Sequence, residues 1–483
     1  MRVEEARADY MATLVDNQGW PEIAIEEIAD VNPRVDKASI PDDLPVSFVP
    51  MPAVGAADGT IHVEETRPAS KVKKGFTAFL EGDVLFAKIT PCMENGKMAV
   101  VPALVNGYGF GSTEFHVLRP KPGMDAKYLY YYVSSQSFRR EAERHMTGAV
   151  GQRRVPTTYL KECKIPVAPL DQQKRIVAEI EKQFSRLDEA VANLKRVKAN
   201  LKRYKAAVLK AAVSGRLVET EAELARREGR SYETGGQLLQ RILETRRSQW
   251  KGKGKYKEPA APDTTDLPEL PEGWVWASLD ELSDVVRGGS PRPAGDPRYF
   301  GGPVPWITVG PLTADESDYL HRVPEGLTFE GKERSRYIEP DTLLLTNSGA
   351  TLGVPKISLI GGCINDGVAA LLGVGYPLKR YLVNFLRTKT MTLRRINQGA
   401  AQPNLNTSII KAMIVPLPPE AEQHQIVAEV DLRLSLLRET EAQVDANFRR
   451  AERMRQSILS RAFSGELINE STFLYTTAAA SAI

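Results

Sequence analysis

One stretch of this sequence is present twice. Residues 160–217 and 410–467 align without a gap at an offset of 250 and share 18 identities in 58 positions. Both copies start with a Pro-rich run, pass through Ile-Val-Ala-Glu and end in Ser-Gly-x-Leu. Chance similarity would give only a handful of identities, so the sequence predicts an internally duplicated architecture with pseudo-two-fold symmetry.

Each copy contains a long predicted helix. Neither 171–213 nor 420–463 contains Gly or Pro, and Gly215 and Gly465 follow where a helix end favours a left-handed residue. About 44 residues at 1.5 Å each give a rod of roughly 65 Å. Apolar side chains recur every seven residues, which is typical of a coiled coil. The predicted seam is Ile180, Phe184, Leu187, Leu194, Leu201 and Val208 in the first helix and Val430, Leu434, Leu437, Val444 and Ile458 in the second.

The distribution of charge favours antiparallel pairing of these helices. Residues 195–210 include seven basic side chains and no acidic one. The acidic side chains of the second helix gather in its first part, at Glu429, Asp431, Glu439, Glu441 and Asp445. Antiparallel order would lay the basic stretch against these acids, and such pairs fix orientation more than stability. A basic face exposed to solvent is the alternative interpretation.

Two globular regions accompany the helices, and their short strands and short helices predict the α+β class. The expected fold is two globular α/β domains separated by two long antiparallel coiled-coil helices, with a pseudo-two-fold internal duplication. The expected segments are the first domain (1–168), the first helix (169–217), a linker with a short helix and a basic run (218–270), the second domain (271–418), the second helix (419–467) and a C-terminal tail (468–483).

Composition narrows the class of protein further. The 483 residues include 64 basic and 61 acidic side chains, a net charge of +3 that neither demands nor excludes nucleic acid. No run approaches the ~18 apolar residues of a membrane span, and the N-terminus does not resemble a signal peptide. Three widely spaced cysteines are typical of a reducing cytoplasm. We therefore expect a cytoplasmic protein without a membrane segment.

Sequence signatures of catalysis are missing. There is no P-loop, no nucleophile elbow, no Asn/Asp-Pro-Pro-aromatic tetrapeptide of amino-methyltransferases, and no metal-ligand spacing among the five histidines. Binding and scaffolding therefore become the leading functional classes, and we expect no catalytic residue and no metal site. Two different modules related by a pseudo-dyad would suit two different half-sites on duplex DNA.

These features resemble the specificity subunit of type I restriction-modification enzymes, and the resemblance covers nearly the whole chain. The matching pieces are Gly82–Lys97, Gly111–Pro120, Leu270–Trp274, Gly399–Asn406, the two Pro-rich helix entries and the closing Ser-Gly-x-Leu. The resemblance implies two target-recognition domains, each reading one part of a split double-stranded DNA site in phage defence. It also implies helices that set the spacing and dock two methyltransferase subunits, joined by two motor-nuclease subunits. Adenine-N6 methylation with S-adenosylmethionine, and cleavage with ATP and Mg²⁺, would belong to those partners, so we expect this chain to bind no cofactor.

The side chains predicted to read DNA are those whose chemistry suits bases or phosphates. Arg and Lys suit guanine, Asn and Gln suit adenine, and small hydroxyls or cations suit phosphates. Residues 1–165 of the first domain include 20 basic and 22 acidic side chains, so the domain as a whole is not basic. Its DNA-binding surface must therefore be a local patch. The candidates are Lys88, Thr90, Asn95, Lys97, Gln152, Arg153 and Arg154 in the first domain, and Arg287, Ser290, Arg292, Asn347, Ser348, Gln402 and Asn404 in the second.

Several alternatives remain open at this level. Asn95 and Asn347 could be turn residues, and Gln402 and Asn404 could cap structure. The chain could serve a two-component type II system that recognises a bipartite site, or be a coiled-coil scaffold that binds no DNA. An enzyme with an unfamiliar site is a third possibility.

Overall fold

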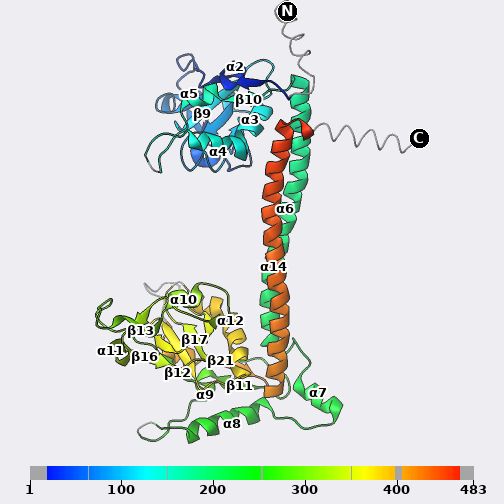
Figure 1. Ribbon diagram of the computed structural model, residues 1–483. Helices are drawn as coiled ribbons and strands as arrows, with labels where there is room; N and C mark the ends of the chain where they lie inside the picture. The colour runs from blue at the N-terminus through cyan, green and yellow to red at the C-terminus, as the bar shows by residue number, and fades with distance from the viewer. Residues whose placement is uncertain are drawn as a thin grey trace, which may run out of the picture. The chain divides into compact units, whose positions relative to one another are not determined.

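The computed structural model describes residues 19–63, 65–149, 151–251, 254–349, 351–396 and 405–467. The chain divides into two compact units, the first formed by Met1–Lys195 with Asp445–Ile483 and the second by Arg196–Val444. Each unit combines one mixed α/β domain with part of two long helices, α6 (Leu170–Ala212) and α14 (Glu420–Phe463) (Figure 1). The boundary between units thus falls inside both helices.

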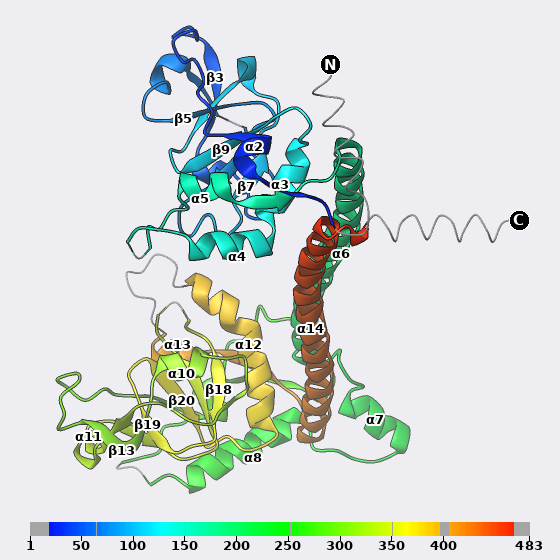
Figure 2. The same cartoon turned by 45° about the horizontal axis from the view of Figure 1, so that its top comes forward.

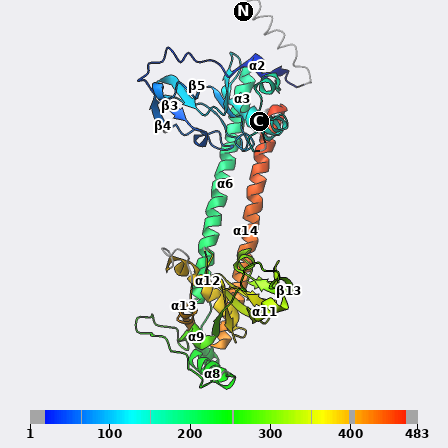
Figure 3. The same ribbon diagram turned by 90° about the vertical axis from the view of Figure 1, so that its left-hand side faces the viewer.

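The first domain has two four-stranded sheets, ordered β2-β9-β6-β7 and β4-β3-β8-β5. Val84–Ala87 is buried at every position, as expected of an apolar run that forms a central strand. Asp125 caps α3 (Ala126–Ser134), which packs Tyr128 and Leu129 into the core. Figure 3 shows β3, β4 and β5 grouped together. The strands are β2 (Ala29–Val31), β3 (Pro45–Val49), β4 (Glu65–Pro68), β5 (Thr77–Leu80), β6 (Val84–Ala87), β7 (Met98–Val100), β8 (Tyr108–Gly111) and β9 (Phe115–Pro120).

The second domain repeats this topology strand by strand. Its sheets are ordered β12-β20-β17-β18-β14 and β15-β13-β19-β16, and the β13–β19 pair is parallel like its counterpart β3–β8. Only β14 (Tyr319–Leu320) has no counterpart in the first domain's sheets as described. The remaining strands are β12 (Asp284–Arg287), β13 (Phe300–Ile307), β15 (Gly326–Leu327), β16 (Arg336–Ile338), β17 (Thr342–Thr346), β18 (Pro355–Ser358), β19 (Gly362–Ile364) and β20 (Val368–Leu372). The predicted duplication is confirmed.

Each domain is closed by a pair of short strands. In the first domain β1 (Glu22–Ala24) pairs antiparallel with β10 (Lys164–Pro166). In the second, β11 (Val275–Ser278) pairs antiparallel with β21 (Ile414–Leu417). Since the first and last strands of a domain hydrogen-bond to each other, the chain enters and leaves each domain at one place.

The long helices are antiparallel within each unit. In unit 1, Arg455 near the end of α14 contacts Asp188 and lies over the Phe184 ring of α6, 4.2 Å from its centroid. In unit 2, Val208 near the end of α6 shares a core with Val430 and Leu434 near the start of α14. Although these helices are long, no helix in the described part of the chain is apolar enough to cross a membrane.

The ends of the helices follow the sequence prediction. Gly215 and Gly465 adopt left-handed backbone conformations, with φ of 65° and 83°. Ile176 and Val177 are buried in the core of the first domain, and the matching pair at 426–427 is buried in the core of the second. The repeated Ile-Val thus anchors each helix on the domain that precedes it.

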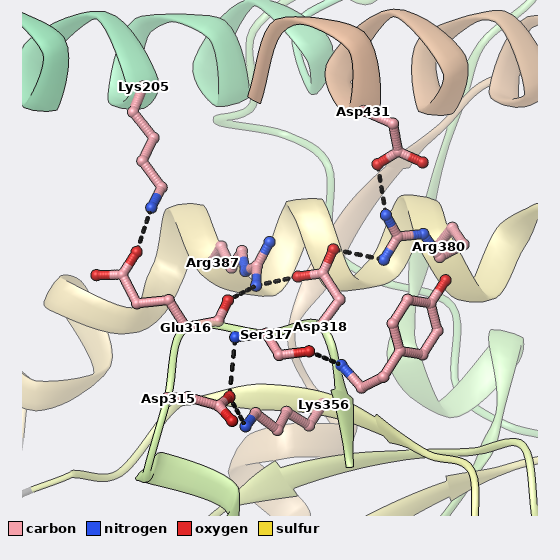
Figure 4. A network of polar contacts seen from close by, with 10 residues as sticks. Lys205, Asp315, Glu316, Ser317, Asp318, Lys356, Arg380, Arg387 and Asp431 are labelled. Carbon is pink, nitrogen blue, oxygen red and sulfur yellow. Dashed lines mark hydrogen bonds and ion pairs between the residues drawn. The ribbon is translucent and has the colours of Figure 1, made fainter. Parts of the chain in front are cut away.

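The predicted pairing of charges between the helices is wrong for three side chains. Lys205 of α6 contacts Glu316 of the second domain, 2.6 Å away, instead of α14. Asp431 of α14 contacts Arg380 (Figure 4). Glu429 pairs with Arg433 of its own helix. The nearest opposite charges of Lys205 and Asp431 belong to the domain packed against the helices, which the sequence pattern of the helices alone does not reveal.

The segment expected as a linker contains two helices that belong to unit 2. They are α7 (Glu221–Glu228) and α8 (Gly235–Ser248), and each starts with a capping box, from Thr220 and Thr234 respectively. Leu238 of α8 is buried in the core of the unit. The short helix expected in this segment therefore corresponds to α8, which packs against the second domain.

Candidate nucleic-acid interface

The candidate residues of the first domain lie together although they are some 60 positions apart in sequence. The Lys88 N–H donates to the Glu114 carbonyl (2.9 Å), and the Lys88 carbonyl accepts from the Val155 N–H (2.9 Å). The Thr90 N–H donates to the Arg153 carbonyl (3.0 Å). The loop after β6 and the segment 152–155 are therefore joined into one surface by backbone hydrogen bonds.

Two carboxylates hold the arginines of this surface. Arg154 donates to both oxygens of Glu114, at 2.9 and 2.7 Å, and this pair lowers the pKa of the Glu114 carboxyl. Arg153 contacts Glu143 at 3.3 Å. Such pairs orient guanidinium groups, so Arg154 is presented in a defined direction.

The other candidates of the first domain differ in their surroundings. The Thr90 hydroxyl donates to Glu94 (2.8 Å), whereas Asn95 and Gln152 are exposed. Lys97 donates to the carbonyls of Met51 (3.2 Å) and Val54 (2.7 Å), which gives its ammonium group a structural role.

A buried histidine behind this surface was not among the sequence candidates. His116 of β9 is 3% exposed, and its Nε2 lies 2.9 Å from the Val155 carbonyl. Burial lowers the pKa of the His116 imidazole, which favours its neutral form. Its Nδ1 lies 3.0 Å from the Asn32 amide. A single histidine in an apolar strand does not indicate from sequence that it lies behind a functional surface. Only the fold shows where His116 lies.

In the second domain the candidates gather around Asp366. Ser290 donates to its carboxylate (2.6 Å), Arg292 lies 3.6 Å from it, and Arg287 donates to its backbone carbonyl (2.7 Å). The Asn347 N–H donates to the neighbouring Gly367 carbonyl (2.9 Å).

The last four candidates of the second domain are less informative. The Asn347 side chain is fully buried and its amide has no hydrogen-bond partner among the described residues. Ser348 is half-buried beside Gly367. Gln402 and Asn404 lie outside the described residues.

The two clusters occupy the same place in the duplicated fold. Glu114 directly precedes β9, and Asp366 lies two residues before β20, the strand that matches β9. In each domain the acid at this strand start holds an arginine. The sequence shows that an acidic residue precedes each of these buried strands. That Glu114 and Asp366 are equivalent follows only from the matching strand order of the two domains.

A basic concavity in the second domain was only partly predicted. It has a volume of about 380 Å³ and is lined by Arg287, Gly288, Gly289, Arg334, Ser335, Arg336 and Tyr337. Of these, only Arg287 was among the sequence candidates. The run Lys-Glu-Arg-Ser-Arg at 332–336 was the available signal. Such alternating charge is equally typical of a solvated turn.

In unit 1 the predicted seam residues Ile180 and Phe184 share a core with Ile458. In unit 2 Val208 shares a core with Val430, Leu434 and Leu437. Leu194 and Leu201 are partly exposed. In unit 1 the helices leave a groove of about 890 Å³ beside Leu187, Leu194 and Ile458. The buried seam residues are Ile180, Phe184, Leu187, Val208, Val430, Leu434, Leu437, Val444 and Ile458.

Sequence comparison assigns the family. The sequence model of the type I restriction modification DNA specificity domain matches residues 17–203 and 271–437, which is more than half of the chain. The chain therefore belongs to the type I restriction-modification DNA specificity family. Its relatives include two Escherichia coli proteins, the type I restriction enzyme EcoAI and EcoEI specificity subunits. They are 26% and 25% identical over 475 and 476 residues, and each match covers 86% of this chain and 77% of the relative.

Solved structures agree on the fold. A chain from a study of complex assembly and conformational transition of the type I R-M system aligns with a TM-score of 0.66 and 21% identity, covering 93% of this chain and 99% of that one. The HsdS subunit from Thermoanaerobacter tengcongensis aligns with a TM-score of 0.55 and 21% identity, covering 93% and 97%.

Proposed function

We propose that this chain provides the DNA specificity of a type I restriction-modification complex and has no catalytic activity of its own. Each domain reads one half of a bipartite duplex site, and the paired helices set the spacing between the halves. The observation that carries the proposal is the repeated fold, in which different side chains cluster at the same strand start of each domain.

The partners follow from the same proposal. Two methyltransferase subunits dock on the helices and two motor-nuclease subunits join them. They supply S-adenosylmethionine, ATP and Mg²⁺ chemistry, while this chain binds no cofactor. The partly exposed seam and the groove beside Leu187 offer apolar surface for such docking. The complex would act in the cytoplasm, in keeping with the three free cysteines.

Methylome mapping tests this proposal. Cells that express the chain with its methyltransferase should acquire N6-methyladenine in one split motif, and cells with the methyltransferase alone should not. Exchange of residues 271–418 for the same module of a related chain should change one half of the motif and leave the other intact, because each domain is closed by its own strand pair. A change in both halves contradicts independent reading.

Two other candidate functions give different results in the same experiment. A coiled-coil scaffold would produce no motif in any strain. A chain of a two-component type II system would produce the split motif but support cleavage beside the site without a motor subunit. Neither has an observation in its favour that the type I proposal lacks.

A further inference from the structure

Three arginines of the second domain surround the concavity defined above. Arg287 ends β12, Arg336 begins β16, and Arg334 lies two residues before it. All three side chains are exposed. The antiparallel partner strands β19 and β20 bring these positions together, since Arg336 pairs with Ile364 and Arg287 pairs with Ala369.

Each of these arginines is held without the use of its terminal nitrogens. Arg287 donates through Nε to the Asp366 carbonyl (2.7 Å), and Arg336 donates through Nε to the Arg287 carbonyl (3.1 Å). The Arg334 guanidinium lies 4.8 Å from the centroid of the buried Tyr299 ring. Backbone hydrogen bonds and ring stacking fix the planes of guanidinium groups while their Nη donors stay available.

Among the described residues, none of the three arginines has an ion-pair partner, and the described lining of the concavity contains no acid. The neighbouring Arg298, by contrast, pairs with Asp296 at 2.7 Å. Like charges held close together repel, so three guanidinium groups around one hollow favour occupation by an anion.

The matching loop of the first domain is also basic. Before β5, which corresponds to β16, it carries Lys71 and Lys74, both exposed. The same edge of the duplicated fold thus carries positive charge in both domains, although the residues differ.

We propose that Arg287, Arg334 and Arg336 form a binding site for one phosphate group of the DNA backbone. This inference rests on the proposed function. Guanidinium groups bind phosphate oxygens through paired, charge-assisted hydrogen bonds, and a preformed cluster loses little freedom on binding. A phosphate contact sets the register of the second domain on the duplex and carries no sequence information. The three arginines therefore position the domain, and other side chains select the bases.

The test uses the full chain assembled with its methyltransferase. Affinity for the cognate duplex is measured across salt concentrations for wild type, the double variant Arg334→Gln/Arg336→Gln and the control Arg298→Gln, with thermal unfolding to verify folding. We expect the double variant to bind roughly tenfold more weakly at low salt, with a salt slope smaller by about one, as the loss of one phosphate contact requires. The loss should be equal on cognate and half-site-mutated DNA. Arg298→Gln should behave as wild type.

A second arm changes the DNA instead of the protein. Neutral methylphosphonate linkages are placed one at a time along the duplex, and wild type should lose affinity at one position to which the double variant is insensitive. An unchanged salt slope, or a changed methylation motif in the double variant, would overturn the phosphate site. If wild type shows no preference for cognate DNA at all, it is the proposed function that fails.

Discussion

Two tryptophans at matching positions donate to different acceptors. Trp20 Nε1 donates to Gln172 (3.1 Å) in unit 1, and Trp274 Nε1 donates to Glu422 (3.0 Å) in unit 2. The second oxygen of Glu422 accepts from the Glu221 N–H at the start of α7 (3.0 Å). Burial raises the pKa of the Glu422 carboxyl to about 6. Unit 2 thus holds a titratable group where unit 1 has a neutral amide.

This difference predicts how stability depends on pH. The folded pKa of Glu422 lies above its ordinary value of 4.5, so the folded state holds the proton more tightly. The contribution of Glu422 to the free energy of unfolding should therefore fall by about 2 kcal/mol as pH rises through the window from 4.5 to 6, and stay constant above it. Urea unfolding from pH 4.5 to 7.5 should show a smaller fall in Glu422→Gln than in wild type. Parallel curves for the two proteins would contradict the assignment.

The sequence predicted several interface residues by type but not their partners. Arg154 and Arg287 were chosen because arginine contacts guanine and phosphate, and both lie in the clusters described above. Lys97 was chosen for the same reason, yet it binds two carbonyls of a loop some 45 residues earlier. Composition does not distinguish a cation that faces solvent from one that secures a distant loop, because the difference lies in tertiary contacts.

Among the elements, the turn 315–318 connects the second domain to both long helices. Asp318 contacts Arg380 (2.6 Å) and Arg387 of α12 (Leu378–Ile396), and Arg380 continues to Asp431 of α14 (Figure 4). Glu316 of the same turn contacts Lys205 of α6. Figure 2 shows α12 alongside α14. Apolar contacts between the second domain and the helices are not directional. These ion pairs are directional, so they fix the orientation of the domain against the helix segments that it contacts.

Removal of the central carboxylate should loosen this connection. Asp318→Asn leaves the nearly buried Arg380 with one partner fewer, so we expect a loss of roughly 3 kcal/mol in the free energy of unfolding. Methylation of a DNA library with varied spacers should then extend to neighbouring lengths while both half-sites keep their sequence. Asp296→Asn, which breaks an exposed pair with Arg298, should do neither. A single unaltered spacer in Asp318→Asn would show that the network has no part in spacing.

The elements that the sequence predicted best are those with a local signal. Helices α6 and α14 coincide within a residue with the stretches 171–213 and 420–463 that lack Gly and Pro, because Pro, Gly and a sustained apolar period mark them. The parallel pairs β3–β8 and β13–β19 were beyond reach, since pairing between strands some 60 residues apart leaves no local pattern.

For the whole molecule, the length of the helices should set the length of the spacer. A seven-residue insertion in each helix, after Val197 and after Asn447, preserves the apolar period and lengthens the rod by roughly 10 Å. The preferred spacer should grow by about three base pairs at 3.4 Å each. Binding should weaken as well, because three pairs rotate one half-site by roughly 100° about the DNA axis. Methylation of a spacer library measures both effects.

Insertions of four residues are the control for this experiment. They turn the seam toward solvent and should impair methylation more than seven-residue insertions do. If the seven-residue variant keeps the parental spacer at parental efficiency, the helices serve only to dock partners.

The strand pairs that close each domain have a consequence for inheritance. Because β1–β10 and β11–β21 bring the start and end of a domain to one place, a gene segment that encodes a whole domain can be replaced without altering the long helices. A single recombination event that replaces one domain would thus change one half of the recognised DNA sequence and leave the other half as it was.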